Sequence, residues 1–146
     1  MLWLKPKPGL EQLAGKPFPV VSVKLMSGEP LTSGFRFYNF FASWCAPCLA
    51  ELPNLRTLKE QTGLPIIGLS WDQNDTAAQQ WLATHKPPFD AIYDDRSGIV
   101  GHEVSLRGLP ETFLVDDKGI IVHHHAGYLM EKDIAPFIEA LAKAKH

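Results

Sequence analysis

The sequence predicts an α/β domain in which a mixed central sheet carries helices on both faces, a three-layer sandwich. Its 146 residues, 45% apolar and 21% charged, suit one packed domain. Segments with strand-like and helix-like patterns follow one another in the order strand, helix, strand, helix, hairpin, helix. We therefore expect residues 1–146 to form one domain. Residues 1–18, rich in proline and glycine, are expected to be an irregular N-terminal extension.

The first half of the chain predicts two strands and a helix. The β-branched run over residues 20–23, followed by a turn at 27–28, indicates an edge strand or hairpin. The short aromatic segment Phe35–Phe41 is typical of a central strand buried on both faces. A helix is expected from Pro47 until Gly63 ends it. Its apolar positions recur at helical spacing and are Leu49, Leu52, Leu55 and Leu58.

The second half continues the alternation. We expect a buried strand over residues 64–71 and a helix over 75–85, then a short extended piece at 91–93 and a short helix at 98–104. Residues 112–116 and 120–125 predict a hairpin, because residues 117–119 have turn chemistry. The final helix is expected to begin near Asp133 as N-cap, with Pro136 in its first turn. Its apolar positions are Ile134, Phe137, Ile138 and Leu141.

Charge and hydropathy exclude several classes of partner. The net charge of −2 gives nucleic acid or an anionic membrane surface no electrostatic reason to bind. Every apolar stretch is far shorter than the roughly 20 residues that a membrane-spanning helix needs. The first residues show neither the apolar core nor the cleavage site of a signal peptide.

The two cysteines, Cys45 and Cys48, indicate redox chemistry. A disulfide that closes so short a loop stabilises a fold by only roughly 2 kcal/mol before strain. A zinc site would need a second cysteine pair, which the chain lacks, and we expect no metal. At the first turn of a helix the Cys45 thiolate would be stabilised, and Cys48, one turn further, could resolve a mixed disulfide. Trp44 is expected to shield the sulfur and offer partners a flat apolar surface.

Two motifs carry a resemblance to a known family. The segment FASWCAPC at residues 41–48 follows a buried strand, and GLPETFLVD at residues 108–116 leads into the expected hairpin. Together they resemble the thioredoxin superfamily, and within it the CcmG/DsbE reductases of cytochrome c maturation and their TlpA/ResA relatives. The similarity extends from about Gly15 to the C-terminal helix.

The resemblance implies a thioredoxin-like fold and a periplasmic reductase that needs no cofactor beyond the Cys45–Cys48 disulfide. Its substrate would be a protein disulfide such as the CxxCH segment of apocytochrome c, and its electrons would come from a membrane thiol donor of the DsbD/CcdA type. A cis peptide between Leu109 and Pro110 would face the cysteines, where the backbone of Leu109 pairs with an extended substrate. We expect a monomer, in a soluble form from which a signal or membrane anchor has been removed.

Two carboxylates are candidates for tuning the cysteines. Glu51 lies three residues after Cys48, and Glu111 follows Pro110; a neighbouring carboxylate raises the pKa of a thiol and can relay protons. Thioredoxins hold a buried acid at the position of Asn39, and asparagine there agrees with the cytochrome-maturation branch. Arg107 departs from that branch, in which this position is often aromatic.

Three other functions stay open. A copper-delivery module would use the cysteine pair and a histidine from residues 123–125. On a strand at most His123 and His125 share a face, which makes a weak site. A peroxidase would need Thr or Ser where Ala42 stands. A disulfide oxidant would share the cysteine pair and differ in its reduction potential.

Overall fold

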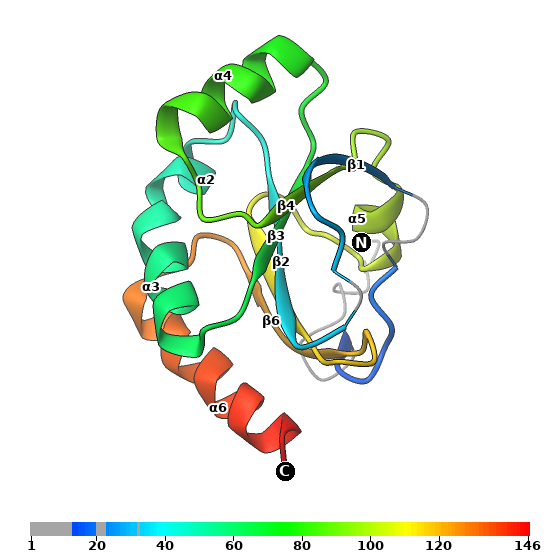
Figure 1. The fold of residues 1–146 in the computed structure, drawn as a ribbon, viewed down its shortest axis with the longest axis vertical. Helices are drawn as coiled ribbons and strands as arrows, with labels where there is room; N and C mark the ends of the chain where they lie inside the picture. Colours follow the sequence, from blue (N-terminus) through cyan, green and yellow to red (C-terminus); the bar gives the residue numbers. More distant parts are fainter. Residues whose placement is uncertain (1–12, 20–22, 32) are drawn as a thin grey trace, which may run out of the picture.

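The computed structural model describes residues 13–19, 23–31 and 33–146. A six-stranded mixed sheet runs through its centre, in the order β1-β4-β3-β2-β5-β6 (Figure 1). The strands are β1 (Lys24–Gly28), β2 (Arg36–Phe41), β3 (Ile66–Ser70), β4 (Ala91–Asp94), β5 (Glu111–Val115) and β6 (Ile121–Ala126). The helices are α2 (Ala46–Ala50), α3 (Leu52–Thr62), α4 (Asp75–His85), α5 (Ile99–Glu103), the short 3₁₀ helix η1 (Glu131–Asp133) and α6 (Ile134–Ala144).

The centre of the sheet is parallel and its edges are antiparallel. Strands β2, β3 and β4 run parallel, whereas β1 pairs antiparallel with β4, and β5 pairs antiparallel with both β2 and β6. All five residues of β3 are buried, as expected for a central strand covered on both faces. The carboxyl ends of β2 and β3 therefore meet at one edge of the sheet, and the chain leaves β2 there to enter the cysteine segment.

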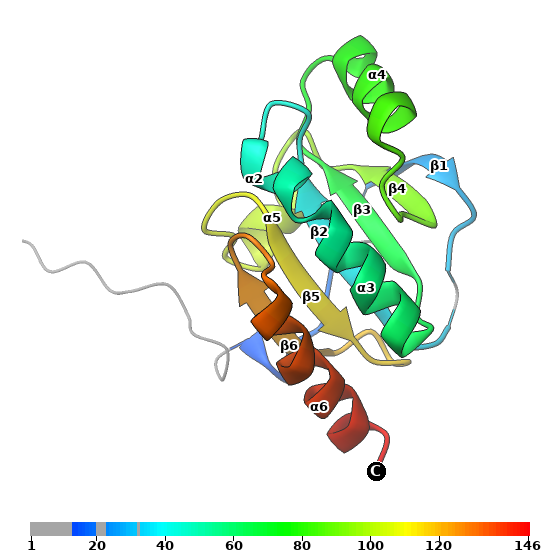
Figure 2. The same cartoon turned by 90° about the vertical axis from the view of Figure 1, so that its left-hand side faces the viewer.

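Two apolar cores lie on opposite faces of the sheet. One contains the cysteine pair, α3, α6 and Trp81 of α4; Figure 2 shows α3 and α6 side by side across this face. The other is covered by α5 together with Leu13 and Phe18. Alternation along β2 separates them, since Phe37 and Phe41 enter the first core and Tyr38 and Phe40 the second. The predicted mixed sheet with helices on both faces is confirmed.

The helix expected from residue 47 to residue 63 is two helices. Glu51 lies between α2 and α3, and Pro53 in the first turn of α3 has no N–H to continue the hydrogen-bond pattern of α2. Leu49, one of the apolar positions that recur at helical spacing, lies before the break and is 39% exposed, whereas Leu52, Leu55 and Leu58 of α3 are buried. Gly63 ends α3 in the left-handed conformation, as predicted.

The N-terminal edge strand differs from the prediction in its position. The edge strand runs over Lys24–Gly28, so residues 27–28, expected to form a turn, end β1 and pair with β4. Residues 1–12 and 20–22 lie outside the described residues. The described residues of the expected irregular extension are hydrogen-bonded to the region of β6: Gly15 N donates to Ile121 O, Ile121 N donates to Lys16 O, and Phe18 N donates to Gly119 O.

The remaining elements fall close to their predicted positions. Helix α4 occupies the predicted range, and β5 and β6 form the expected hairpin around Gly119. Asp133 stands at the N-cap position of α6, but its carboxylate accepts from Met130 N instead of capping that helix. None of the helices within residues 13–19, 23–31 and 33–146 combines the length and apolar character needed to cross a bilayer.

Candidate active site

Cys45 and Cys48 form a disulfide at the start of α2. Cys45 is the N-cap residue, its Cα lies 5.3 Å from that of Cys48, and Cys48 N donates to Cys45 Sγ at 3.2 Å. This N–H would stabilise a thiolate on Cys45 after reduction. Both residues are nearly buried, with 6% of Cys45 and 1% of Cys48 exposed. Cys45 is thus the sulfur that a partner reaches first.

The loop that precedes Cys45 is held in place by hydrogen bonds to Asp72. The Asp72 carboxylate, nearly buried at the carboxyl end of β3, accepts from Ser43 N at 3.0 Å and from Ser43 Oγ at 2.6 Å. These charge-assisted hydrogen bonds hold the backbone two residues before the nucleophile. Trp44 lies between Ser43 and Cys45, and 67% of its surface is exposed. A partner protein can therefore contact this side chain, as predicted.

Glu51 is fully buried in a polar network directly after the cysteine helix. Its Oε2 accepts from Asn39 Nδ2 at 2.9 Å, and its Oε1 accepts from Leu129 N at 3.0 Å. Asn39 Nδ2 also donates to Thr112 Oγ1 at 3.0 Å, so the network joins β2, β5 and the α2–α3 junction. Burial raises the pKa of Glu51 to about 7, although both hydrogen bonds lower it. A carboxyl group that titrates near neutral pH can both give and take a proton.

This titration predicts a pH-dependent stability. Because the pKa of Glu51 is raised from 4.5 to about 7 on folding, the folded protein binds this proton more tightly than the unfolded chain. The contribution to stability is fully present below pH 4.5 and is lost as the pH rises through about 7, a change of about 3 kcal/mol. Urea unfolding at pH 5 and pH 8 should show this loss in the wild type and not in Glu51→Gln. Equal pH dependence in both proteins would contradict it.

The peptide bond between Leu109 and Pro110 is cis, as expected. The loop over residues 107–110 leads into β5, and Leu109 packs against the core that contains the cysteines as well as the opposite one. Within the described part of the chain, the backbone N–H and C=O of Leu109 form no hydrogen bond. Free backbone groups at this loop are what an added strand from a partner requires, and that the loop faces the cysteines stays a prediction.

Glu111 lies apart from the Glu51 network. Its neighbour Thr112 faces Asn39, so alternation along β5 turns Glu111 to the other face of the sheet. There its carboxylate, 1% exposed, accepts from Arg107 N and lies 2.8 Å from His124 Nε2. The structure thus brings Glu51, but not Glu111, into the cysteine-side network, and tuning by Glu111 stays a prediction.

The three consecutive histidines contact different neighbours. His123 packs edge-on against Phe137, and burial lowers the pKa of its imidazole. His125 Nε2 lies 3.1 Å from Tyr128 O and 3.3 Å from Asp133 Oδ2. Among the described residues there is no group of three or more His, Cys, Asp or Glu able to hold a metal ion.

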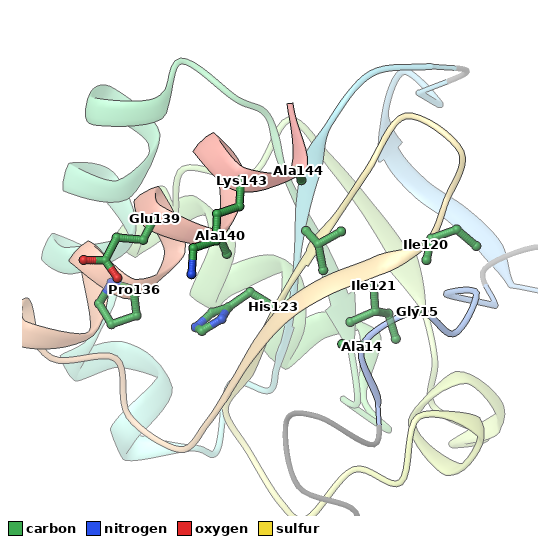
Figure 3. A pocket seen from close by; sticks show the side chains of 11 residues that line it. Ala14, Gly15, Ile120, Ile121, His123, Pro136, Glu139, Ala140, Lys143 and Ala144 are labelled. Carbon is green, nitrogen blue, oxygen red and sulfur yellow. The ribbon is translucent and has the colours of Figure 1, made fainter. Parts of the chain in front are cut away.

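An apolar groove of about 520 Å³ lies between β6, α6 and the segment around Gly15 (Figure 3). Its lining includes His123, Ala140 and Lys143 and none of the residues around the disulfide. Beside the cysteines a shallower hollow is lined by Ala46, Pro47, Ala50 and Tyr128. The hollow next to the disulfide is thus shallow and open, which suits a macromolecular partner better than a small substrate.

Comparison with known proteins agrees with this chemistry. The redoxin profile matches residues 13–140. The chain belongs to the redoxin family. Thiol:disulfide interchange protein HelX of Rhodobacter capsulatus is 38% identical over 136 residues, covering 88% of this chain and 77% of HelX. Protein DsbE of Tatumella citrea, also a thiol:disulfide interchange protein, is 37% identical over 130 residues, covering 80% of this chain and 67% of DsbE.

A solved structure shares the fold. The thioredoxin domain of a thiol-disulfide oxidoreductase from Bacteroides vulgatus superposes with a TM-score of 0.70 at 21% identity, covering 88% of this chain and 96% of the other. The resemblance identified from the two sequence motifs is confirmed, and this redoxin is a thiol–disulfide oxidoreductase.

Sequence reasoning missed two supporting residues of this redoxin. Asp72 had a usable signal, because it lies two residues after the buried strand beside β2, where parallel strands end together. For His124 there was no signal in the sequence beyond its place in the predicted strand, because its contact with Glu111 depends on the β5–β6 register.

Proposed function

We propose that this redoxin is a periplasmic reductase of cytochrome c maturation, which reduces the disulfide of an exported CxxCH segment. The observation that carries the proposal is the buried Glu51, held one turn beyond Cys48. A carboxylate there disfavours a stable thiolate pair, and a redox protein whose reduced form is not stabilised is a reductant. The relatives named DsbE and HelX are thiol:disulfide interchange proteins, which supports the same class of reaction.

The reaction balances without a cofactor. The Cys45 thiolate attacks one sulfur of the partner disulfide and releases the other as a thiolate, giving a mixed disulfide. Cys48 then attacks Cys45 Sγ, the partner leaves with both sulfurs reduced, and two electrons have left the protein. A dithiol on a membrane protein of the DsbD/CcdA type resets the Cys45–Cys48 pair by the reverse exchange. The chain would act as a monomer, since one exposed face meets both partners.

The test is a synthetic CxxCH peptide in its disulfide form. We expect the reduced protein to reduce this peptide faster than a CxxC disulfide peptide without the histidine, with Cys45→Ser inactive as control. Oxidation of the dithiol peptide by the disulfide form, with no reduction in the other direction, would contradict the proposal. Equal rates with both peptides would show that the protein does not recognise the histidine of the CxxCH segment.

Trp44 should serve recognition and not redox chemistry. Its exposed indole offers apolar surface next to Cys45, so Trp44→Ala should raise KM for a peptide disulfide by about fivefold to tenfold and leave the reduction potential unchanged. Steady-state kinetics and a redox titration measure the two effects. An unchanged KM would contradict the assigned surface. Leu49→Ala changes another exposed apolar side chain, within α2, and shows whether the effect is specific to the position of Trp44.

A further inference from the structure

The Glu111 carboxylate is buried and each of its oxygens has a partner. Oε1 accepts from Arg107 N at 2.6 Å, and Oε2 lies 2.8 Å from His124 Nε2, with 1% and 6% of the two side chains exposed. Burying a carboxylate is costly unless it is hydrogen-bonded or paired. Both contacts therefore stabilise the buried carboxylate. One connects β5 to β6, and the other connects β5 to the loop before Pro110.

His124 is itself held in place. It lies opposite Phe113 in the β5–β6 pairing, and the two rings stack with centroids 4.5 Å apart. Glu111 is two residues before Phe113 on the same face of β5, so it meets His124 diagonally across the strand pair. A fixed ring thus orients the carboxylate that binds Arg107 N.

The loop over residues 107–110 is held at both ends. Glu111 binds its first backbone N–H, at Arg107, and Gly127 N donates to Pro110 O at 2.8 Å. Between these two points the backbone of Leu109 has no hydrogen bond within the described residues. A hollow lined by Arg107, Leu109, Glu111 and Gly127 opens beside the loop. The free backbone is therefore presented from a frame that β5 and β6 supply.

We propose that the Glu111–His124 pair positions this loop for extended peptide substrates. It sets the Leu109 N–H and C=O where a strand from the partner can pair with them. This role replaces the tuning of the cysteines expected of Glu111 from the sequence, since the pair takes no part in the exchange at sulfur. The inference rests on one part of the proposed function, namely that the substrate disulfide belongs to a polypeptide. The pair should therefore matter for disulfides carried on a peptide backbone and not for small disulfides that have none.

The experiment compares two substrates in four proteins: wild type, Glu111→Ala, Glu111→Gln and His124→Phe. The first substrate is an eight-residue peptide closed by a CxxC disulfide and unrelated to cytochromes; the second is dithiobis-nitrobenzoate, a disulfide without a peptide backbone. Glu111→Ala should lower kcat/KM for the peptide by about tenfold, chiefly through KM, and change the reaction with dithiobis-nitrobenzoate by less than about twofold. The reduction potential should not move.

The conservative variants sharpen the test. Glu111→Gln keeps an oxygen for Arg107 N and should retain most of the peptide activity. His124→Phe keeps a ring on Phe113 but removes the contact with Glu111, and should show a partial, peptide-specific loss even if Glu111→Ala fails to fold. Glu103→Ala, which removes an exposed carboxylate of α5, is the matched control and should resemble the wild type.

Equal losses with both substrates, or a shifted reduction potential, would overturn the proposal and favour tuning of the cysteines by Glu111. Unchanged peptide kinetics in Glu111→Ala and His124→Phe would overturn it as well. The cytochrome proposal fails independently: if the CxxCH peptide is reduced no faster than the unrelated peptide, the substrate is wrong while the loop assignment stands.

Discussion

Cys45→Ser should reduce the rate of disulfide exchange by more than about a thousandfold, because it removes the attacking sulfur itself. Cys48→Ser should behave differently. Cys45 can still attack a partner disulfide, but nothing then resolves the mixed disulfide, which accumulates. Cys45 is the more exposed of the two and accepts a backbone hydrogen bond from Cys48 N, which supports this division of roles.

Mass spectrometry after incubation of each reduced variant with a disulfide peptide measures the outcome. Cys48→Ser should carry one peptide on Cys45, and Cys45→Ser should carry none. The double variant controls for non-specific adducts. Trapping of the peptide on Cys48 in the Cys45→Ser protein would reverse the assignment.

Glu51→Gln should slow the exchange by about a hundredfold at neutral pH, the size expected for losing a positioned acid–base group. The pKa of Glu51, raised by burial to about 7, lets the carboxyl group hold or release a proton as the cysteines change protonation state. In the wild type the pH–rate profile should therefore carry an inflection near 7, which glutamine should abolish.

The control is Glu60→Gln, which changes an exposed carboxylate on the next helix and should leave the profile unaltered. Stopped-flow tryptophan fluorescence across pH 5 to 9 follows the reaction, with Trp44 as the reporter beside the disulfide. An inflection near 7 that persists in Glu51→Gln would assign the proton to another group and remove Glu51 from the chemistry.

Local pattern was enough to predict most of this fold. The aromatic strand at β2, the amphipathic α4 and the β5–β6 hairpin are encoded by residues near in sequence, and each lies close to its expected place. The break between α2 and α3 also had a local cause in Pro53, but the regular spacing of leucines favoured one helix. Strand β1 was misplaced because its position depends on pairing with β4, a contact distant in sequence.

The candidate site divides in the same way. The cysteine pair and Pro110 stand in short motifs, so the sequence identified them without any knowledge of packing. Glu51 was chosen for its spacing from Cys48, and the structure adds why its proton is held: the side chain is fully buried, and burial raises its pKa although Asn39 Nδ2 and Leu129 N donate to the carboxylate. The side of the sheet on which Glu111 lies follows from strand alternation once β5 is placed.

The reduction potential of the Cys45–Cys48 pair tests the central claim most directly. It is measured by equilibrating the protein in a series of dithiothreitol or glutathione redox buffers and following tryptophan fluorescence. A dedicated reductant should have a potential near or below that of thioredoxin, about −270 mV. A value near that of DsbA, about −120 mV, would contradict the reductase and make this redoxin an oxidant of protein thiols.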